Sequence, residues 1–281
     1  MHDPIRLMQG DCLTLLQGLP DGCIDLTVTS PPYDNMRTYN GNITQWSHEK
    51  FMEIAKELYR VTRPGGCIVW IVADATVKGS ETGSSFRQAL HFHDIGFNLH
   101  DTMIWIKDGG GSVGSNLCYR QNFEYMFVLS KGRPKAVNLI RDHMNLTAGH
   151  TRVGKGRRRA DGTINDENGH VRVTPETSRR NNWWLIPRNS VDTGHPAVFP
   201  YTLARDHVLS WSNPGDTVLD PFMGSGTTGL ACKETGRQFI GMEIDRVIYT
   251  LPQGENTNGG NHHEARRKKR VQLHQAVRKA V

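Results

Sequence analysis

The sequence predicts an α/β fold built on a doubly wound, mostly parallel sheet, and three observations lead to this prediction. First, short runs rich in β-branched residues alternate with segments whose apolar residues recur at helical spacing. Second, residues 67–72 (CIVWIV) form a nearly continuous apolar run, as expected of a parallel strand that is covered on both faces. Third, the strand-like residues 217–220 lead through a glycine-rich turn into a helix-like segment, which is typical of such folds.

Each predicted element has a local signal for its type. The strands are short apolar runs, and they are expected at residues 5–8, 24–29, 67–72, 102–106, 124–129, 217–220 and 239–243. The helices have apolar residues at helical spacing, and they are expected at residues 12–19, 49–61, 84–95, 200–211 and 227–235. Asp21-Gly22 predicts a turn before the second strand, and Pro64-Gly65-Gly66 is expected to end the second helix.

The alternation of strands and helices stops between residues 131 and 193. This stretch is polar and basic, and it contains the sequence RVGKGRRRADG at 152–162. Loops of this length without structure are uncommon in compact domains, so we interpret the stretch as an inserted lobe or a long functional loop. Trp183 and Trp184 lie near its end, and they are expected either to stack on bases or to anchor the lobe to the core.

Composition excludes several classes of protein. The chain has 281 residues and a net charge of +6, which is consistent with a polyanionic partner. Its five cysteines are scattered without a C-x-x-C pair, which argues against a disulfide framework and for a reducing compartment. Residues 1–11 lack a hydrophobic signal region, and no apolar run approaches the ~20 residues of a membrane helix. We therefore expect a cytoplasmic protein with no membrane contact, and His262-His263 alone predicts no metal site.

A glycine-rich loop within TVLDPFMGSGTTG (217–229) is the first candidate binding site. Gly224, Gly226 and Gly229 match the dinucleotide fingerprint literally, although an ordinary tight turn gives the same pattern. Glu243 ends the next strand, where an acidic residue is placed to bind ribose hydroxyls. Asp220 would repel a pyrophosphate, and it suits instead a cofactor with a cationic amino group such as that of a methionine moiety.

The second candidate motif is Ser30-Pro31-Pro32-Tyr33, directly after the strand at 24–29. The alternative explanation is a proline strand terminator beside a core tyrosine. Proline fixes φ, so the direction of the Pro31 carbonyl is set before any ligand binds. The motif therefore offers a rigid acceptor with a hydroxyl and an aromatic ring beside it.

Together, TSPPY and DPFMGSGTT resemble the S-adenosylmethionine-dependent DNA amino-methyltransferases, which modify the exocyclic nitrogen of cytosine or adenine in duplex DNA by base flipping. The order of the motifs resembles the beta arrangement of that family, and the resemblance covers roughly residues 4–247. It implies a seven-stranded sheet with one antiparallel strand. It also implies four parts: a catalytic half (1–130), an inserted target-recognition segment (131–193), a cofactor-binding half (194–250) and a basic tail (251–281).

The resemblance implies a role for each matching residue. Ser30 and the Pro31 carbonyl accept hydrogen bonds from the amino group of the base, Pro32 stiffens the motif, and Tyr33 stacks on the flipped base. The residues implied to bind S-adenosylmethionine are Asp11, Cys12, Phe199, Asp220, Pro221, Phe222, Gly224, Ser225, Gly226, Thr227, Thr228 and Glu243. The residues expected to contact DNA are Arg37, Tyr39, Arg152, Lys155, Arg157, Arg158 and Arg159, although a solvated basic loop is the alternative for the last five.

The target base depends on Ser30. Serine at this position is more typical of cytosine-N4 enzymes and aspartate of adenine-N6 enzymes, so we expect cytosine-N4, with adenine-N6 as the alternative. Cytosine-C5 enzymes carry a Pro-Cys dipeptide, and this chain has none. Protein-glutamine enzymes carry asparagine in place of Ser30, and a related enzyme acting on RNA is a further alternative.

Two hypotheses from other classes remain at this point, a nicotinamide-dependent oxidoreductase and a non-catalytic DNA-binding protein. The resemblance also allows a homodimer, a solitary enzyme or a partner of a cognate restriction endonuclease, and the sequence determines none of these. One departure from the family pattern follows residue 245. The sequence RVIYTLPQGENTNGG there contains Pro252 and several glycines, which stop the expected final helix early.

Overall fold

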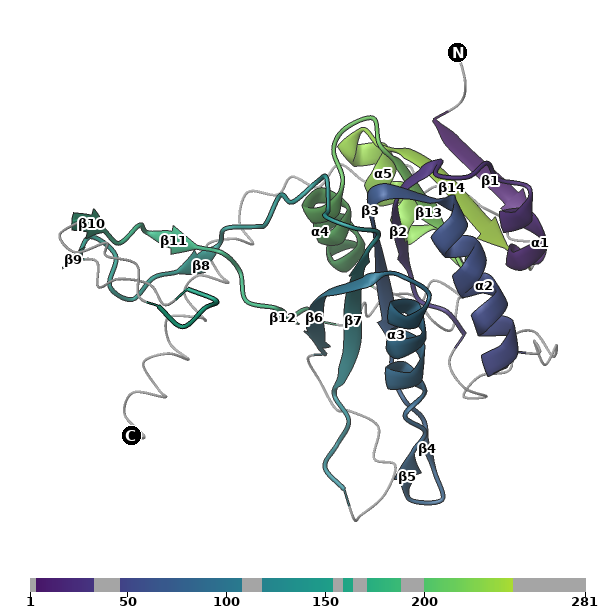
Figure 1. The fold of residues 1–281 in the computed structure, drawn as a ribbon, viewed down its shortest axis with the longest axis horizontal. Coiled ribbons are helices and arrows are strands. Elements are labelled where there is room, and N and C mark those ends of the chain that lie inside the picture. Colours follow the sequence, from purple (N-terminus) through teal and green to yellow (C-terminus); the bar gives the residue numbers. More distant parts are fainter. Residues whose placement is uncertain are drawn as a thin grey trace. The chain divides into compact units, whose positions relative to one another are not determined.

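An eight-stranded sheet forms the centre of the protein (Figure 1). The computed structural model describes residues 4–32, 46–107, 118–153, 159–163, 171–187 and 200–244. The strands follow the order β1-β14-β13-β2-β3-β7-β6-β12. Their bounds are β1 Ile5–Gln9, β2 Ile24–Thr29, β3 Thr62–Val72, β6 Asn98–Ile106, β7 Phe123–Ser130, β12 Trp183–Leu185, β13 Thr217–Asp220 and β14 Gln238–Glu243.

Only β7 runs antiparallel to its neighbours in this sheet, and every other adjacent pair is parallel. The predicted doubly wound, mostly parallel α/β sheet with one antiparallel strand is therefore confirmed. The count of seven strands was too low by one, because Trp183–Leu185 from the inserted segment pairs with Ile104–Ile106 of β6. A three-residue strand gives too short an alternating pattern to predict from sequence.

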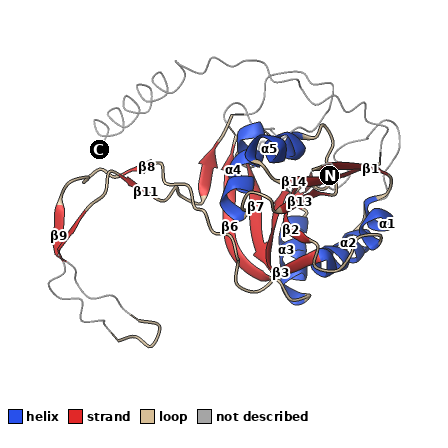
Figure 2. Ribbon diagram, turned by 90° about the horizontal axis from the view of Figure 1, so that it is seen from above, coloured by secondary structure: helices blue, strands red, loops and turns tan. Residues whose placement is uncertain are grey.

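Within the described residues, five helices cover the two faces of the sheet (Figure 2). Their bounds are α1 Cys12–Gln17, α2 His48–Val61, α3 Ser84–Asp94, α4 Tyr201–Trp211 and α5 Thr227–Thr235. One hydrophobic cluster lies between the sheet and α4 and α5, and a second lies between the sheet and α1, α2 and α3. Buried apolar side chains therefore cover both faces of the sheet, as is typical of a mostly parallel sheet.

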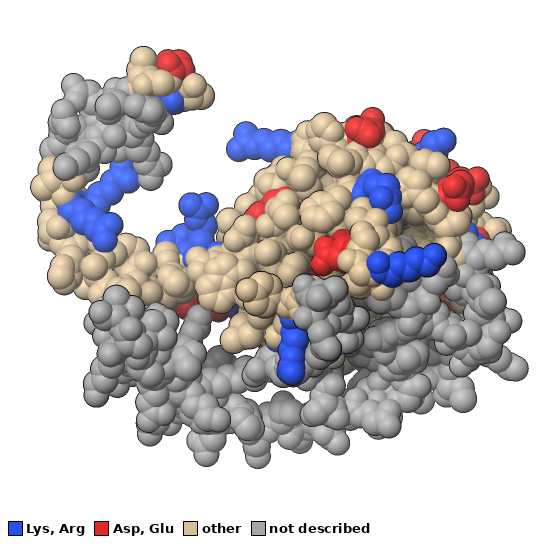
Figure 3. Space-filling model, turned by 90° about the horizontal axis from the view of Figure 1, so that it is seen from below, with Lys and Arg blue, Asp and Glu red and all other residues tan. Residues whose placement is uncertain are grey.

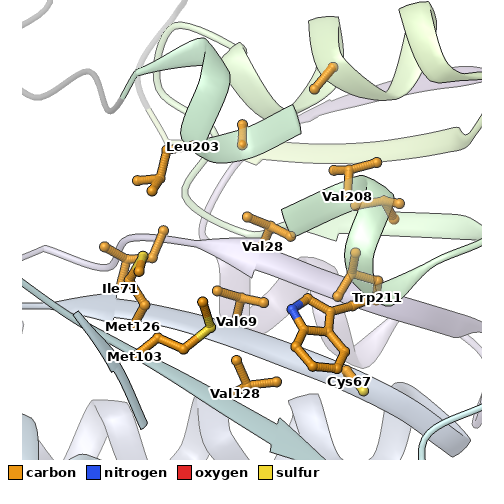
Figure 4. Packing of buried hydrophobic residues seen from close by; sticks show 14 of the residues in the cluster. Val28, Cys67, Val69, Ile71, Met103, Met126, Val128, Leu203, Val208 and Trp211 are labelled. Carbon is orange, nitrogen blue, oxygen red and sulfur yellow. The ribbon is translucent and has the colours of Figure 1, made fainter. Parts of the chain in front are cut away.

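The strand β3 shows how one sequence serves both clusters. Cys67, Val69 and Ile71 belong to the cluster on the α4 side, whereas Ile68 and Trp70 belong to the other. This follows from the two-residue period of a strand, and all five side chains are at most 1% exposed. Figure 4 shows Val69 and its neighbours on the sheet facing residues of α4 across the first cluster.

The main difference from the predicted elements lies at the start of β3. The strand begins at Thr62, before Pro64-Gly65-Gly66, rather than at Cys67. Gly65 has φ of +84°, and its N–H donates to the carbonyl of Lys131 at 2.7 Å, so the glycines turn the chain without leaving the sheet. The register with β2 shifts at this point, as expected of a bulge.

In the part of the chain that the structure describes, three short strand pairs lie outside the main sheet. The hairpin of β4 (Thr76–Val77) and β5 (Ser80–Glu81) follows β3, and positive φ angles at Lys78 and Gly79 suit its tight turn. The inserted segment contains the antiparallel pairs β8–β11 and β9–β10. Their bounds are β8 His143–Met144, β9 Thr151–Val153, β10 Val171–Val173 and β11 Thr177–Ser178.

Trp184 anchors the inserted segment to the core. Its ring stacks on His207 of α4 at 4.5 Å between centroids, and the Arg180 guanidinium lies over the Trp184 ring, 5.0 Å from its centroid. Arg180 also forms ion pairs with Asp206 at 2.7 Å and Asp142 at 2.6 Å. Burial, together with Arg180, lowers the pKa of His207 to about 3, so this imidazole is neutral.

Trp183 differs from its neighbour, because 46% of it is exposed whereas Trp184 is 5% exposed. Of the two roles expected for the tryptophan pair, Trp184 therefore has the anchoring one. Among the described residues, no helix is long and apolar enough to cross a membrane.

Candidate active site

Four strands of the sheet end beside one another, and each leads into a residue of interest. In the spatial order of the sheet, β1 leads to Asp11, β14 ends at Glu243, β13 ends at Asp220 and β2 leads to Ser30. These strands are parallel, so their carboxyl ends lie at the same edge. In open α/β sheets, ligands bind at this edge.

Asp220 is fully buried and accepts three hydrogen bonds. Its Oδ1 accepts from Thr29 Oγ1 at 2.6 Å and from the backbone N–H of Phe222 at 3.2 Å. Its Oδ2 accepts from Thr228 Oγ1 at 2.8 Å. The carboxylate has no exposed surface, and its expected contact with the cofactor amino group stays a prediction.

The electrostatic state of Asp220 follows from this burial. Loss of hydration raises its pKa to about 6, the nearby Glu243 carboxylate adds to the rise, and the three hydrogen bonds oppose it. The ordinary value is near 3.8. The folded protein therefore binds this proton more tightly than the unfolded chain does.

Asp220→Asn is expected to change how stability depends on pH. Because the folded pKa lies above the unfolded one, the stabilisation from the neutral acid is fully present below about pH 4 and is lost as pH rises through about 6. Between about pH 4 and pH 7, the free energy of unfolding of the unaltered protein should fall by about 3 kcal/mol relative to that of the variant. Urea denaturation of both proteins across this range measures the difference, and a difference that stays constant with pH would contradict the raised pKa.

The glycine loop between β13 and α5 packs closely against β14. Gly224 and Gly226 have φ of +48° and +79°, a region that side chains with a Cβ rarely adopt. A Cβ on Gly241 of β14 would lie 2.3 Å from the Met223 sulfur, and one on Gly229 would lie 2.7 Å from the Phe239 ring. Glycine is therefore required here for both backbone conformation and close packing.

The side chain of Glu243 connects the end of β14 to this loop. Its Oε2 accepts from the Gly224 N–H at 2.9 Å, and its backbone carbonyl accepts from the Gly10 N–H at 2.8 Å. The residue is half-buried, as an acceptor for ribose hydroxyls would need to be. The predicted position of Glu243 at the end of its strand is confirmed.

Asp11 caps the N-terminus of α1 and pairs with a lysine that the sequence analysis did not identify. It accepts from the N–H groups of Leu13 and Thr14, and the Lys50 ammonium lies 2.6 Å from its Oδ2. Burial acts to raise the pKa of Asp11, but Lys50 and the backbone donors outweigh it, so the pKa lies below its ordinary value. Lys50 belongs to α2, and no local signal indicates a partner 39 residues away.

Cys12 follows Asp11 and has no reactive character. Burial raises the pKa of its thiol to about 12, with a further contribution from Asp11. The thiol is therefore protonated and not a nucleophile. The described cysteines are all free.

An aromatic residue that the sequence analysis missed lies beside the loop. The Trp46 ring contacts Phe222 edge-on at 5.5 Å between centroids, and Phe222 also approaches Trp70 at 6.3 Å. Trp46 precedes α2 and is half-buried. It was missed because a single tryptophan before a helix looks like any core residue.

The structure describes some of the remaining predicted site residues, whereas others lie outside the described part of the chain. Pro31, Pro221 and Thr228 are buried, whereas Ser30, Pro32 and Phe222 are half-buried. In the loop, the hydroxyls of Ser225 and Thr227 lie 3.3 Å apart. Seven predicted residues lie outside the described part of the chain: Tyr33, Arg37, Tyr39, Lys155, Arg157, Arg158 and Phe199.

The two described arginines of the basic stretch belong to the inserted segment. Arg152 lies on β9, opposite Arg172 of β10, and donates to Thr147 Oγ1 at 2.8 Å. Arg159 is exposed. Figure 3 shows described Lys and Arg side chains at several separate places on one face of the molecule. Within the described ranges, no group of three or more metal-ligating side chains occurs.

Comparison with known proteins identifies the family. The DNA methylase family of N6 and N4 methyltransferases matches residues 24–253, and this chain belongs to it. The orphan methyltransferase M.BamHII of Bacillus amyloliquefaciens is 49% identical over 237 residues, which cover 82% of this chain and 87% of that protein. The DNA adenine methyltransferase YhdJ of Escherichia coli K12 is 28% identical over 249 residues, which cover 85% of this chain and 78% of that protein.

A solved structure shares the fold. The PvuII DNA methyltransferase, described as cytosine-N4-specific, aligns with a TM-score of 0.61 at 22% identity, covering 86% of this chain and 84% of that one. With the family established, the chain is a DNA methyltransferase of the N6 and N4 class. This assignment excludes the alternatives of a nicotinamide-dependent oxidoreductase and a non-catalytic DNA-binding protein.

Proposed function

We propose that the enzyme methylates the exocyclic N4 of cytosine in duplex DNA, with N6 of adenine as the alternative target. The observation that carries this proposal is the position of Ser30 and Pro31. They directly follow β2 and lie at the same sheet edge as the glycine loop that follows β13. This arrangement supports a site in which a base and a methyl donor meet.

The chemistry of the target explains why these residue types suit it. The lone pair of an exocyclic amine is delocalised into the ring, which makes the nitrogen a poor nucleophile. Hydrogen bonds from its two N–H groups to Ser30 Oγ and the Pro31 carbonyl draw the nitrogen toward tetrahedral geometry. The rigid Pro31-Pro32 pair sets the carbonyl direction in advance, which reduces the entropy lost on binding. Tyr33 stacks on the flipped base in this proposal.

The residues around the loop fit S-adenosylmethionine. Gly224 and Gly226 let the backbone approach a ligand closely, and the half-buried Glu243 offers an acceptor for ribose hydroxyls. Asp11 and Cys12 lie at the neighbouring end of β1, where we propose contact with adenine. The remaining proposed contacts are Phe199, Pro221, Phe222, Ser225, Thr227 and Thr228. When bound, the cofactor supplies a methyl on a sulfonium, so no covalent enzyme intermediate is needed.

The choice of base rests on Ser30. One curated relative is named an adenine methyltransferase and one solved neighbour is described as cytosine-N4-specific, so relatedness alone does not select the base. A serine hydroxyl at the first motif position favours cytosine-N4.

The partners follow from the same proposal. Duplex DNA is expected to contact Arg152 and Arg159 of the inserted segment, and also Arg37, Tyr39, Lys155, Arg157 and Arg158. The 49% identical relative is named an orphan methyltransferase, which favours an enzyme without a cognate endonuclease. We also propose that the enzyme forms a homodimer and is cytoplasmic.

Transfer of label from tritiated cofactor tests the proposed reaction. Purified protein is incubated with DNA, and the digested nucleosides are separated by chromatography. Label in N4-methyldeoxycytidine is the expected result. Label in N6-methyldeoxyadenosine would select the alternative base, and label in 5-methyldeoxycytidine would contradict the role given to Ser30.

A further inference from the structure

One hydrogen bond joins the two motifs of the active site. Thr29 is the last residue of β2 and directly precedes Ser30, and Asp220 is the last residue of β13 and directly precedes the glycine loop. The Thr29 hydroxyl donates to the Asp220 carboxylate at 2.6 Å. Neither residue has any exposed surface. The bond therefore connects segments 191 residues apart in sequence, within a dry environment.

Backbone pairing does not make this connection. The paired residues of β13 and β2 are Val218 with Leu26 and Leu219 with Thr27, and the register ends there. The Thr29–Asp220 bond continues the link between the strands for one more step, up to the residue before Ser30. It thus acts at the point where β2 and β13 leave the sheet and lead into the Ser30 motif and the glycine loop.

The same carboxylate also holds both ends of the glycine loop. It accepts from the Phe222 N–H at 3.2 Å, where the loop begins, and from Thr228 Oγ1 at 2.8 Å, in the first turn of α5. Hydrogen bonds to an ionised acceptor are about twice as strong as neutral ones. A single buried group therefore fixes the start of the loop, its end and the strand that carries Ser30.

We propose that Asp220 and Thr29 are positioning residues that set the place of the Ser30-Pro31 acceptors relative to the cofactor loop, without touching the cofactor themselves. This inference rests on the proposed function, because it gives Ser30 its role. Methyl transfer needs aligned reactants, and a misplacement of about 1 Å costs on the order of 100-fold in rate. Loosening the bond should therefore slow transfer more than it weakens cofactor binding.

Substitutions on β2 provide a matched test. Thr29→Val removes the hydroxyl, and Thr27→Val makes the same change two residues earlier on the same strand. Thr27 is also fully buried, and its hydroxyl has no hydrogen-bond partner within the described residues. Thr29→Ser retains the hydroxyl and should restore the rate. If Thr29→Val does not fold, Thr29→Ala gives the same comparison.

Two measurements are made on each full-length variant: cofactor affinity by calorimetry, and the single-turnover rate of methyl transfer to DNA at saturating cofactor. For Thr29→Val we expect at least a ~10-fold slower transfer with a cofactor Kd within ~2-fold of the unaltered enzyme. Thr27→Val should transfer at close to the normal rate. Adding Asp220→Asn to Thr29→Val should slow transfer by less than Asp220→Asn does alone, because the uncharged asparagine oxygen weakens the same bond that Thr29→Val removes.

Other results would overturn the proposal in distinguishable ways. Equal transfer rates for Thr29→Val and Thr27→Val would show that the bond does not position Ser30. A large loss of cofactor affinity in Asp220→Asn, additive with Thr29→Val, would show that Asp220 contacts the cofactor. Failure of the unaltered enzyme to label any DNA would instead overturn the proposed function itself, and this inference with it.

Discussion

Alanine in place of Ser30 is expected to slow single-turnover methyl transfer about 100-fold, the scale on which one preorganised hydrogen-bonding group in a transition state acts. In the proposed reaction, the Ser30 hydroxyl accepts a hydrogen bond that strengthens as the amine becomes tetrahedral, so its loss should raise the barrier. Cofactor affinity should stay within about two-fold, because Ser30 follows β2 and lies outside the glycine loop. Rapid-quench measurement with tritiated cofactor gives the rate, and calorimetry gives the affinity.

Ser80→Ala is the control for this experiment. Ser80 lies on the exposed β4–β5 hairpin, where its hydroxyl donates to the adjacent Glu81 carbonyl at 3.2 Å. Removal of the Ser80 hydroxyl should leave the rate of methyl transfer and the cofactor affinity unchanged. An unchanged rate for Ser30→Ala would show that the Pro31 carbonyl suffices and that the serine does not hold the base.

Removal of the Trp184 side chain is expected to cost about 3–5 kcal/mol of unfolding free energy. The ring is 5% exposed and stacks on His207, so alanine would leave a cavity between β12 and α4. Loss of the stacking contact with Arg180 would add to the cost, because that guanidinium also pairs with buried Asp206. Urea denaturation of the variant measures the effect.

The neighbouring Trp183→Ala provides the matched control. Trp183 has the same size and lies on the same strand, but it is 46% exposed, so its removal should cost less than about 1 kcal/mol. Similar costs for the two substitutions would contradict the anchoring role of Trp184.

Local patterns were sufficient to predict most of the sheet. The helix at Thr227–Thr235 and the strand at Thr217–Asp220 have the predicted bounds, because apolar periodicity and the flanking glycines act within a few residues. The same reasoning placed Ser30 after a strand and Glu243 at the end of another, and both positions are confirmed.

Contacts between distant segments could not be predicted in this way. The pairs Thr29–Asp220, Lys50–Asp11 and Trp184–His207 are set by how strands and helices pack. No short pattern marks their partners, so the sequence analysis identified none of the hydrogen bonds that the buried Asp220 carboxylate accepts. The eighth strand was missed for the same reason, because β12 is defined only by its pairing with β6.

The most direct test of the proposed reaction is nucleoside mass analysis of genomic DNA from a bacterial host that has no DNA methyltransferase of its own. The host expresses either the unaltered enzyme or Ser30→Ala at equal protein levels. We predict N4-methyldeoxycytidine in the DNA of the first and a strongly reduced amount in that of the second. DNA from the first host without any methylated exocyclic amine, or with methylation confined to cytosine C5, would contradict the proposal.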